Sequence, residues 1–219
     1  MRPTGPSLIL PHGTPVIVVD PLRDFMDQSG TFAKCYGAQD TESIRDVLPV
    51  LTEMLRTWRG KTWNILCQSL YARNQWKVRG LEELCTKENC SGRESLIGRA
   101  SFDFTATKSD NSVTSMAQGE MEELGRHMRK HLILTGVTTT SCIAKSVEAL
   151  RIGFVRIIIP RNAVAARNSQ QKKADALFEG WSDERMTKVI VVPTWREITF
   201  ESPPGAASPY SSDEDTPGQ

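Results

Sequence analysis

Five runs of apolar, β-branched residues recur along the chain. They cover residues 16–20 (VIVVD), 63–68 (WNILCQ), 131–137 (HLILTGV), 155–160 (VRIIIP) and 189–193 (VIVVP). Continuous apolar runs of this length are typical of strands that are buried on both faces of a sheet. We therefore expect five strands in the core of the fold.

Helical patterns lie between most of these runs. One apolar helix face is marked by Val47, Leu48, Leu51, Leu55 and Trp58. Asp46 is its candidate N-cap, Pro49 fits its first turn, and Gly60 would end it. Met116, Met121 and Leu124 indicate a second helix, and residues 174–178 indicate another. Strands that alternate with helices predict a doubly wound α/β fold, with helices on both faces of a mainly parallel sheet.

The pattern also divides the chain. We expect an N-terminal extension at 1–14, a single domain at 15–201 and a flexible acidic tail at 202–219, where Pro, Ser, Gly and acidic residues replace apolar ones. Residues 69–110 carry no long periodic pattern. Long loops of this kind often cover a functional site.

Composition excludes several classes of partner. The 219 residues carry a net charge of +1, which argues against nucleic acid as a partner. No segment approaches the roughly 18 apolar residues that a membrane span needs, and no convincing signal peptide precedes the first run. The five cysteines form an odd set without paired metal spacing, which favours free thiols in a reducing compartment. We expect a cytoplasmic protein without a membrane partner.

Cys142 lies where the third apolar run changes into a helical pattern. Its neighbours Thr139, Thr140 and Ser141 offer N-cap oxygens, and the N–H groups of a first helical turn favour a thiolate. A lowered thiol pKa would make Cys142 a nucleophile. The alternative for a lone cysteine is a buried structural residue.

Asp20 ends the first apolar run and would therefore lie at the carboxyl end of a strand, as Cys142 does. An acid beside a thiol is the minimum for base-assisted nucleophilic attack. The alternative for Asp20 alone is an aspartate that caps a turn.

Three segments in this order carry a family resemblance: VIVVDPLRDF, FTAT at 104–107, and LILTGVTTTSCIAKSVEALRIGF. Over most of 15–165 the chain resembles the isochorismatase-like cysteine hydrolase superfamily. The resemblance implies a doubly wound α/β fold and a catalytic aspartate, lysine and cysteine, of which Asp20 and Cys142 match. It also implies a cis peptide between Val137 and Thr138, and an oxyanion hole made by the backbone N–H groups of Thr138 and Cys142.

The lysine of the resemblance has no obvious match. It is expected about six residues before the phenylalanine that corresponds to Phe104, where Arg99 is the nearest cation. A guanidinium could hold the charge of the aspartate, but it stays protonated and could not shuttle a proton. Lys108 is a second candidate, and Arg99 as a solvated surface charge is the alternative. Phe25, Tyr71 and Phe104 are expected to bind substrate.

Metal-bearing nicotinamidases of the superfamily carry an aspartate and histidines where this chain reads QSLYAR, at 68–73. We therefore expect no metal and no cofactor. The resemblance favours a homo-oligomeric hydrolase, a dimer or tetramer, that cleaves a small amide or ureido C–N bond through a thioester on Cys142. Two alternatives stay open: an isochorismatase that hydrolyses a vinyl ether, and a catalytically impaired scaffold, which the unmatched lysine supports.

Overall fold

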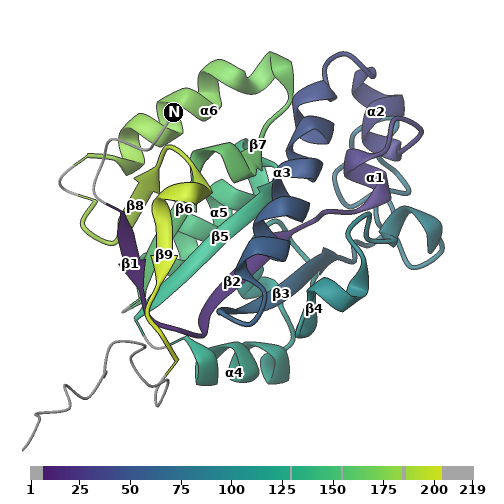
Figure 1. Ribbon diagram of the computed structural model, residues 1–219. Helices are drawn as coiled ribbons and strands as arrows, with labels where there is room; N and C mark the ends of the chain where they lie inside the picture. Colours follow the sequence, from purple (N-terminus) through teal and green to yellow (C-terminus); the bar gives the residue numbers. More distant parts are fainter. Residues whose placement is uncertain (1–6, 129, 154, 184–185, 204–219) are drawn as a thin grey trace, which may run out of the picture.

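A parallel sheet forms the centre of the protein (Figure 1). The computed structural model describes residues 7–203 except 129, 154, 184 and 185, so most of the predicted acidic tail lies outside the described residues. The strands of this central sheet have the order β4-β3-β2-β5-β6-β8, with β7 beside β5, and every pairing in it is parallel. The strands are β2 (Thr14–Val19), β3 (Thr62–Ser69), β4 (Phe104–Lys108), β5 (His131–Val137), β6 (Arg156–Pro160), β7 (Val164–Ala165) and β8 (Val189–Val192).

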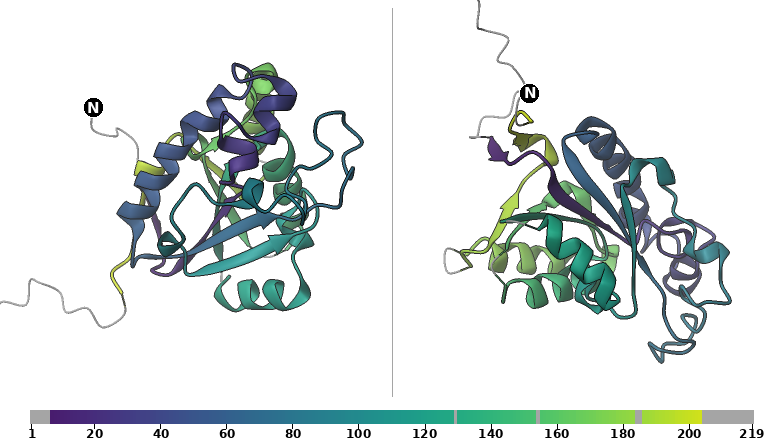
Figure 2. Two further views of the ribbon diagram at one scale, coloured as in Figure 1. Left: turned by 90° about the vertical axis from the view of Figure 1, so that its right-hand side faces the viewer. Right: turned by 90° about the horizontal axis from the view of Figure 1, so that it is seen from below.

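Helices cover both faces of this sheet, as Figure 2 shows. Alternate residues of β2 point to opposite faces, so Val16 and Val18 join one apolar cluster while Ile17 and Val19 join another. The first cluster holds α1 (Arg23–Met26), α2 (Thr31–Tyr36) and α3 (Glu42–Trp58). The second holds α4 (Gln118–His127), α5 (Ala144–Leu150) and α6 (Gln171–Trp181). The predicted doubly wound α/β fold is confirmed.

All five predicted strands are present, but the sequence pattern missed β4. This strand reads FTATK and lies at the edge of the sheet, beside β3. Only Ala106 and Lys108 are buried, so the strand has no continuous apolar run. Because β4 ends at Lys108, missing this strand also hid the position of that lysine at the carboxyl end of the sheet.

The boundaries of α3 differ from the prediction. The helix begins at Glu42 with Thr41 at the N-cap, so Asp46 is not the cap and Pro49 lies inside the helix rather than in its first turn. Ile44 is fully buried and extends the apolar face toward the N-terminus. Packing against the sheet therefore outweighs the hydrogen bond that Pro49 cannot donate.

The segment predicted as an N-terminal extension partly belongs to the domain. Strand β1 (Leu8–Leu10) pairs in parallel with β9 (Ile198–Phe200), forming a separate two-stranded sheet. Phe200 packs edge-on against Trp58 of α3, with ring centroids 5.3 Å apart. The two ends of the described chain thus lie together on one side of α3.

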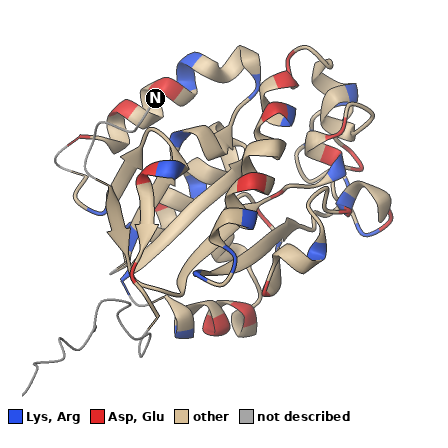
Figure 3. Ribbon diagram, viewed as in Figure 1, with Lys and Arg blue, Asp and Glu red and all other residues tan. Residues whose placement is uncertain are grey.

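Charged residues of both signs are spread over the helices and loops, whereas the strands are nearly free of them (Figure 3). Within the described residues, no helix is both long enough and apolar enough to span a lipid bilayer.

The order of strands creates a switch point beside β2. The chain passes from β2 to β3 on one side and returns later to β5 on the other. In open parallel sheets, ligands bind at the carboxyl ends of the strands near such a point. The excursion over 70–103, between β3 and β4, contains only short helical turns. Its first part, 71–84, lies at this end of the sheet, as predicted for a covering loop, and the chain then returns to the amino end of β3, where the Asp103 N–H donates to Asn64 O.

Candidate active site

Asp20 directly follows β2 and is fully buried. Its backbone has φ +52°, a left-handed conformation that turns the chain sharply after the strand. Its Oδ1 accepts a hydrogen bond from the backbone N–H of Ser69, at 2.8 Å. Its Oδ2 lies 2.9 Å from Lys108 Nζ, and among the described residues it accepts no further hydrogen bond. One carboxylate oxygen is therefore fixed by the sheet and the other faces the cluster described next.

Lys108 ends β4 and is fully buried in a polar cluster. Besides Asp20, its Nζ contacts Ser69 Oγ at 2.6 Å, Tyr71 Oη at 3.0 Å and Cys142 Sγ at 3.6 Å. Burial by itself lowers the pKa of Lys108, but the neighbouring Asp20 and Cys142 outweigh it and hold the pKa well above its ordinary value. The lysine is therefore a fixed cation between the carboxylate and the thiol.

The structure corrects the choice of cation. Arg99 lies in an exposed single turn, Arg99–Ser101, outside the cluster. Lys108, which the sequence ranked second, makes the ion pair with Asp20. The register explains the difference, because β4 pairs with β3 such that Lys108 lies opposite Ser69, at the carboxyl end of the sheet.

Cys142 lies in a wide helical turn, Thr139–Ile143, between β5 and α5. The turn begins without a side-chain cap, so the predicted capping by Thr139, Thr140 or Ser141 is wrong; instead the Thr138 carbonyl accepts bonds from the N–H groups of Ser141 and Ile143. The Ser146 hydroxyl donates to the Cys142 carbonyl at 2.6 Å. These bonds fix the backbone that carries the thiol.

The thiol pKa also differs from the prediction. Burial raises the pKa of Cys142 above its ordinary value, although the charge of Lys108 lowers it. The negative charge of Asp20 raises it further. The resting group is therefore a protonated thiol.

The expected cis peptide bond joins Val137 and Thr138. The role of the Thr138 and Cys142 N–H groups as an oxyanion hole stays a prediction.

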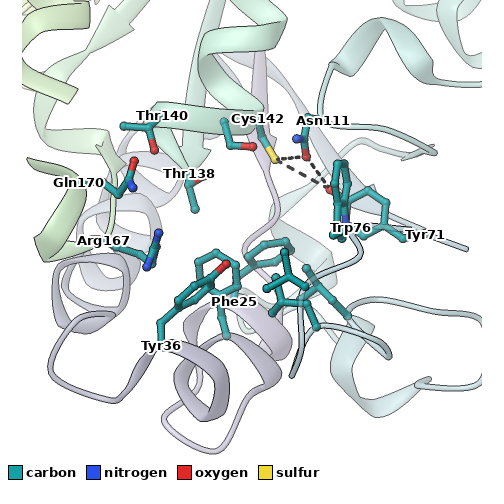
Figure 4. Close-up of a pocket in the computed structure, with 15 residues that line it drawn as sticks. Phe25, Tyr36, Tyr71, Trp76, Asn111, Thr138, Thr140, Cys142, Arg167 and Gln170 are labelled. Atoms are coloured by element: carbon teal, nitrogen blue, oxygen red, sulfur yellow. Dashed lines mark hydrogen bonds between the residues drawn. The ribbon is translucent and has the colours of Figure 1, made fainter. Parts of the chain in front are cut away.

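A cavity of about 250 Å³ opens above the thiol (Figure 4). Phe25 and Tyr71 line it, as expected for substrate-binding residues, but Phe104 does not. Phe104 begins β4, at the opposite end from Lys108, and stacks on Trp63 with centroids 5.7 Å apart. The apolar wall also includes Phe32, Tyr36, Trp76, Val78, Leu81 and Leu84, and the polar residues are Asn111, Thr138, Thr140, Ser141, Arg167 and Gln170.

Arg167 is a site residue that the sequence pattern did not reveal. Figure 4 shows its side chain across the cavity from Cys142. Its guanidinium carbon lies 3.7 Å from the centre of the Tyr36 ring, and its Nη1 lies 2.9 Å from Asp40 Oδ2. A stacked and ion-paired guanidinium is held in one orientation. The one feature that could have indicated Arg167 is its position shortly after β7, but this two-residue strand is too short to recognise in the sequence.

From the sequence, we predict no metal ligands at the carboxyl end of β3. Ser69 and Tyr71 occupy this position, with Lys108 Nζ between them and Asp20. Among the described residues, no group of three or more His, Cys, Asp or Glu side chains could hold a metal ion.

Comparison with known proteins identifies the fold. No protein-family model and no curated protein matches the sequence. Among solved structures, an isochorismatase-like hydrolase from Alkaliphilus metalliredigens has a TM-score of 0.65 at 16% identity, over 84% of this chain and 96% of its own. The nicotinamidase from Bacillus subtilis has a TM-score of 0.63 at 16% identity, over 82% and 100%.

A third structure is similar over the same region. The N-carbamoylsarcosine amidase from Thermoplasma acidophilum has a TM-score of 0.61 at 16% identity, over 82% of this chain and 95% of its own. Each alignment spans nearly the whole of the solved chain, so the described domain corresponds to a complete fold of this type. The protein therefore has the fold of the isochorismatase-like hydrolases, as its sequence motifs predicted.

Proposed function

We propose that this protein is a cysteine hydrolase that cleaves the C–N bond of a small amide or ureido compound. The observation that carries the proposal is the buried contact chain Asp20–Lys108–Cys142 at the floor of a cavity. A general base, a fixed cation and a thiol are the groups that nucleophilic attack on a carbonyl requires. The amidases among the structural neighbours support the same class of reaction.

The steps follow from the positions of these groups. Asp20 takes the thiol proton while Cys142 Sγ attacks the substrate carbonyl, and the backbone N–H groups of Thr138 and Cys142 hold the oxyanion. The tetrahedral intermediate then collapses, the C–N bond breaks, and Asp20 returns the proton to the leaving amine. Water attacks the thioester and loses its proton to Asp20. The C–S bond then breaks, the acid leaves, and Asp20 passes the proton to the Cys142 sulfur, which restores the thiol. Lys108 holds the Asp20 charge in place and stabilises the thiolate.

The cavity restricts the substrate. Its volume of about 250 Å³ is at the small end of ligand pockets, and its walls are largely aromatic and aliphatic. Arg167 offers a fixed cation opposite the thiol. This arrangement favours a small molecule with an apolar body and a carboxylate or carbonyl oxygen that reaches the guanidinium.

The test is hydrolysis of a panel of small amides and ureido acids, measured by release of ammonia or amine. We expect turnover by the wild-type protein and none by Cys142→Ala. Cys90→Ala is the matched control, because Cys90 is an exposed free thiol that does not line the cavity. It should turn over at the wild-type rate.

Undiminished turnover by Cys142→Ala would contradict the thiol mechanism. Release of pyruvate from a vinyl ether, at a rate that Cys142→Ala retains, would favour an isochorismatase, which needs no thioester. The scaffold alternative depended on a missing lysine. Because Lys108 supplies a cation to Asp20 and Cys142, that alternative has lost its main support.

A further inference from the structure

Tyr71 has an unusual place in the cluster. Its side chain is 4% exposed, and its hydroxyl lies 3.9 Å from Cys142 Sγ and 3.4 Å from Asn111 Oδ1. On its other side, Oη contacts Lys108 Nζ at 3.0 Å and Ser69 Oγ at 2.7 Å. The phenol thus contacts both the charged Lys108 and the thiol.

The hydrogen bonds around the Tyr71 oxygen have a defined direction. The ammonium of Lys108 can only donate, so the Tyr71 oxygen accepts from it. Ser69 Oγ also accepts from Lys108, at 2.6 Å, and donates to Tyr71 Oη at 2.7 Å. With both lone pairs of the phenol oxygen engaged, the Tyr71 proton can point only toward Asn111 and Cys142.

The phenol keeps this proton. Burial raises the pKa of Tyr71 well above its ordinary value, and the neighbouring negative charges of Cys142 and Asp20 raise it further. Tyr71 is therefore a neutral donor when the thiol ionises. The Asn111 oxygen, which accepts from the thiol at 3.6 Å, can hold the Tyr71 proton in the resting state.

We infer that Tyr71 is a catalytic residue, a hydrogen-bond donor to the Cys142 thiolate whose orientation is set by Ser69 and Lys108. When Asp20 removes the thiol proton, the Tyr71 O–H turns from Asn111 to the sulfur. No bond is made or broken at the phenol. The inference rests on the proposed function only in taking Cys142 as the nucleophile.

The test is the pH dependence of Cys142 alkylation by iodoacetamide, measured by mass spectrometry in wild type and Tyr71→Phe. Phenylalanine keeps the ring that packs edge-on against Trp76, with centroids 4.9 Å apart, so the fold should be retained. We expect the alkylation midpoint of Tyr71→Phe to rise by about one pH unit, the size of one hydrogen bond to a charged group.

Thr62→Val is the matched control, because Thr62 also has a buried hydroxyl but bonds Trp58 O and Asn64 Oδ1 outside the cavity. Its midpoint should equal that of wild type. A Tyr71→Phe midpoint equal to wild type would overturn the inference.

A second variant tests the orientation of the phenol. Ser69→Ala should also raise the midpoint, and in the Tyr71→Phe background it should add little, because Ser69 acts through the phenol. A full additional shift in the double variant would contradict this chain of bonds. Alkylation of Cys142 needs no substrate, so the two tests are independent. An unchanged alkylation midpoint would not affect the hydrolysis test with Cys142→Ala, and a negative hydrolysis test would not prevent the midpoint from being measured.

Discussion

At the scale of single residues, the buried pair of Asp20 and Lys108 determines the character of the site. Both side chains have no exposed surface, and their charged atoms lie 2.9 Å apart. A buried ion pair adds little net stability, but the loss of one partner leaves an uncompensated charge in the core. In the proposed mechanism this pair supplies the base and the cation beside the thiol.

Lys108→Met tests this dependence. We expect its free energy of unfolding to fall by about 3–5 kcal/mol, because Asp20 would be left buried without its partner. Chemical denaturation measures the change. Arg99→Met is the control, and as an exposed substitution it should alter the free energy by less than about 0.5 kcal/mol. Equal stability of the two variants would argue against Lys108 as the cation of the site.

Arg167→Gln tests the proposed substrate contact. Loss of a charged hydrogen bond of about 1.5–3 kcal/mol should raise KM for an anionic substrate by about 10- to 100-fold, with a smaller effect on kcat. Arg161→Gln is the control, since Arg161 forms a similar ion pair with Asp175 outside this cavity. Steady-state kinetics would count against an anion subsite if the two variants had the same KM.

The sequence predicted part of this site. Asp20 and Cys142 could be located because each follows an apolar strand that is visible in the pattern. Lys108 was ranked below Arg99 because β4 has no apolar run, and only its pairing with β3 brings it to the site. Arg167 follows a two-residue strand, and the thiol pKa depends on burial that the sequence does not display.

At the scale of elements, the contact between β2 and β5 brings Asp20 and Cys142 together. Gly136 of β5 has φ +103°, and a Cβ atom there would lie 2.1 Å from the carbonyl oxygen of Val19. Only glycine permits this approach. Val19 directly precedes Asp20, and Gly136 lies at the end of the strand that leads into the turn of Cys142.

Gly136→Ala should therefore destabilise the protein by about 2–4 kcal/mol, from backbone strain and the forced separation of the strands. Gly125→Ala is the control, since Gly125 lies in α4 with open space around it. Alanine there should stabilise the protein by up to about 1 kcal/mol. Thermal unfolding of the two variants should shift in opposite directions, and a shared direction would contradict the packing argument.

A second contact between elements fixes the loop that follows β3. The carboxylate of Asp24 in α1 is 3% exposed and accepts hydrogen bonds from Thr31 Oγ1 at 2.6 Å, the Cys85 N–H at 2.6 Å and Asn89 Nδ2 at 2.8 Å. Cys85 is next to Leu84, which lines the cavity. Asp24 thereby ties the loop to α1 and α2.

Asp24→Ala should loosen this loop more than the rest of the domain. We expect faster amide hydrogen exchange at Cys85 and its neighbours, and a loss of about 3 kcal/mol in the free energy of unfolding from bonds to a charged group. Asp27→Ala, which removes a more exposed carboxylate, is the control. Unchanged exchange in the loop would show that Asp24 does not hold it.

At the scale of the whole molecule, the fold places several ionisable groups in its interior. Burial raises the pKa of Cys67 and Cys85 well above ordinary values, and charge interactions raise that of Lys108 despite its burial. A group whose pKa is raised by folding contributes stability below its unfolded pKa and loses it as the pH rises. The unfolded pKa values are about 8.5 for cysteine and 10.4 for lysine.

The melting temperature should therefore fall as the pH rises above about 8.5, and more steeply above about 10.4. Cys67→Ala should flatten the first part of this fall, and Cys90→Ala, at an exposed position, should leave it unchanged. Calorimetric scans between pH 7 and 11 measure the effect. A melting temperature that stays constant over this range would contradict the burial of these groups.

The measurement that tests the central claim most directly is intact-mass spectrometry of the protein after acid quench during turnover of an amide or ureido substrate. The proposed mechanism predicts an adduct with the mass of the acyl group, located on the peptide that contains Cys142 and absent from Cys142→Ala. Turnover without any adduct, at a rate that Cys142→Ala retains, would contradict a thioester and with it the proposed role of the Asp20–Lys108–Cys142 cluster.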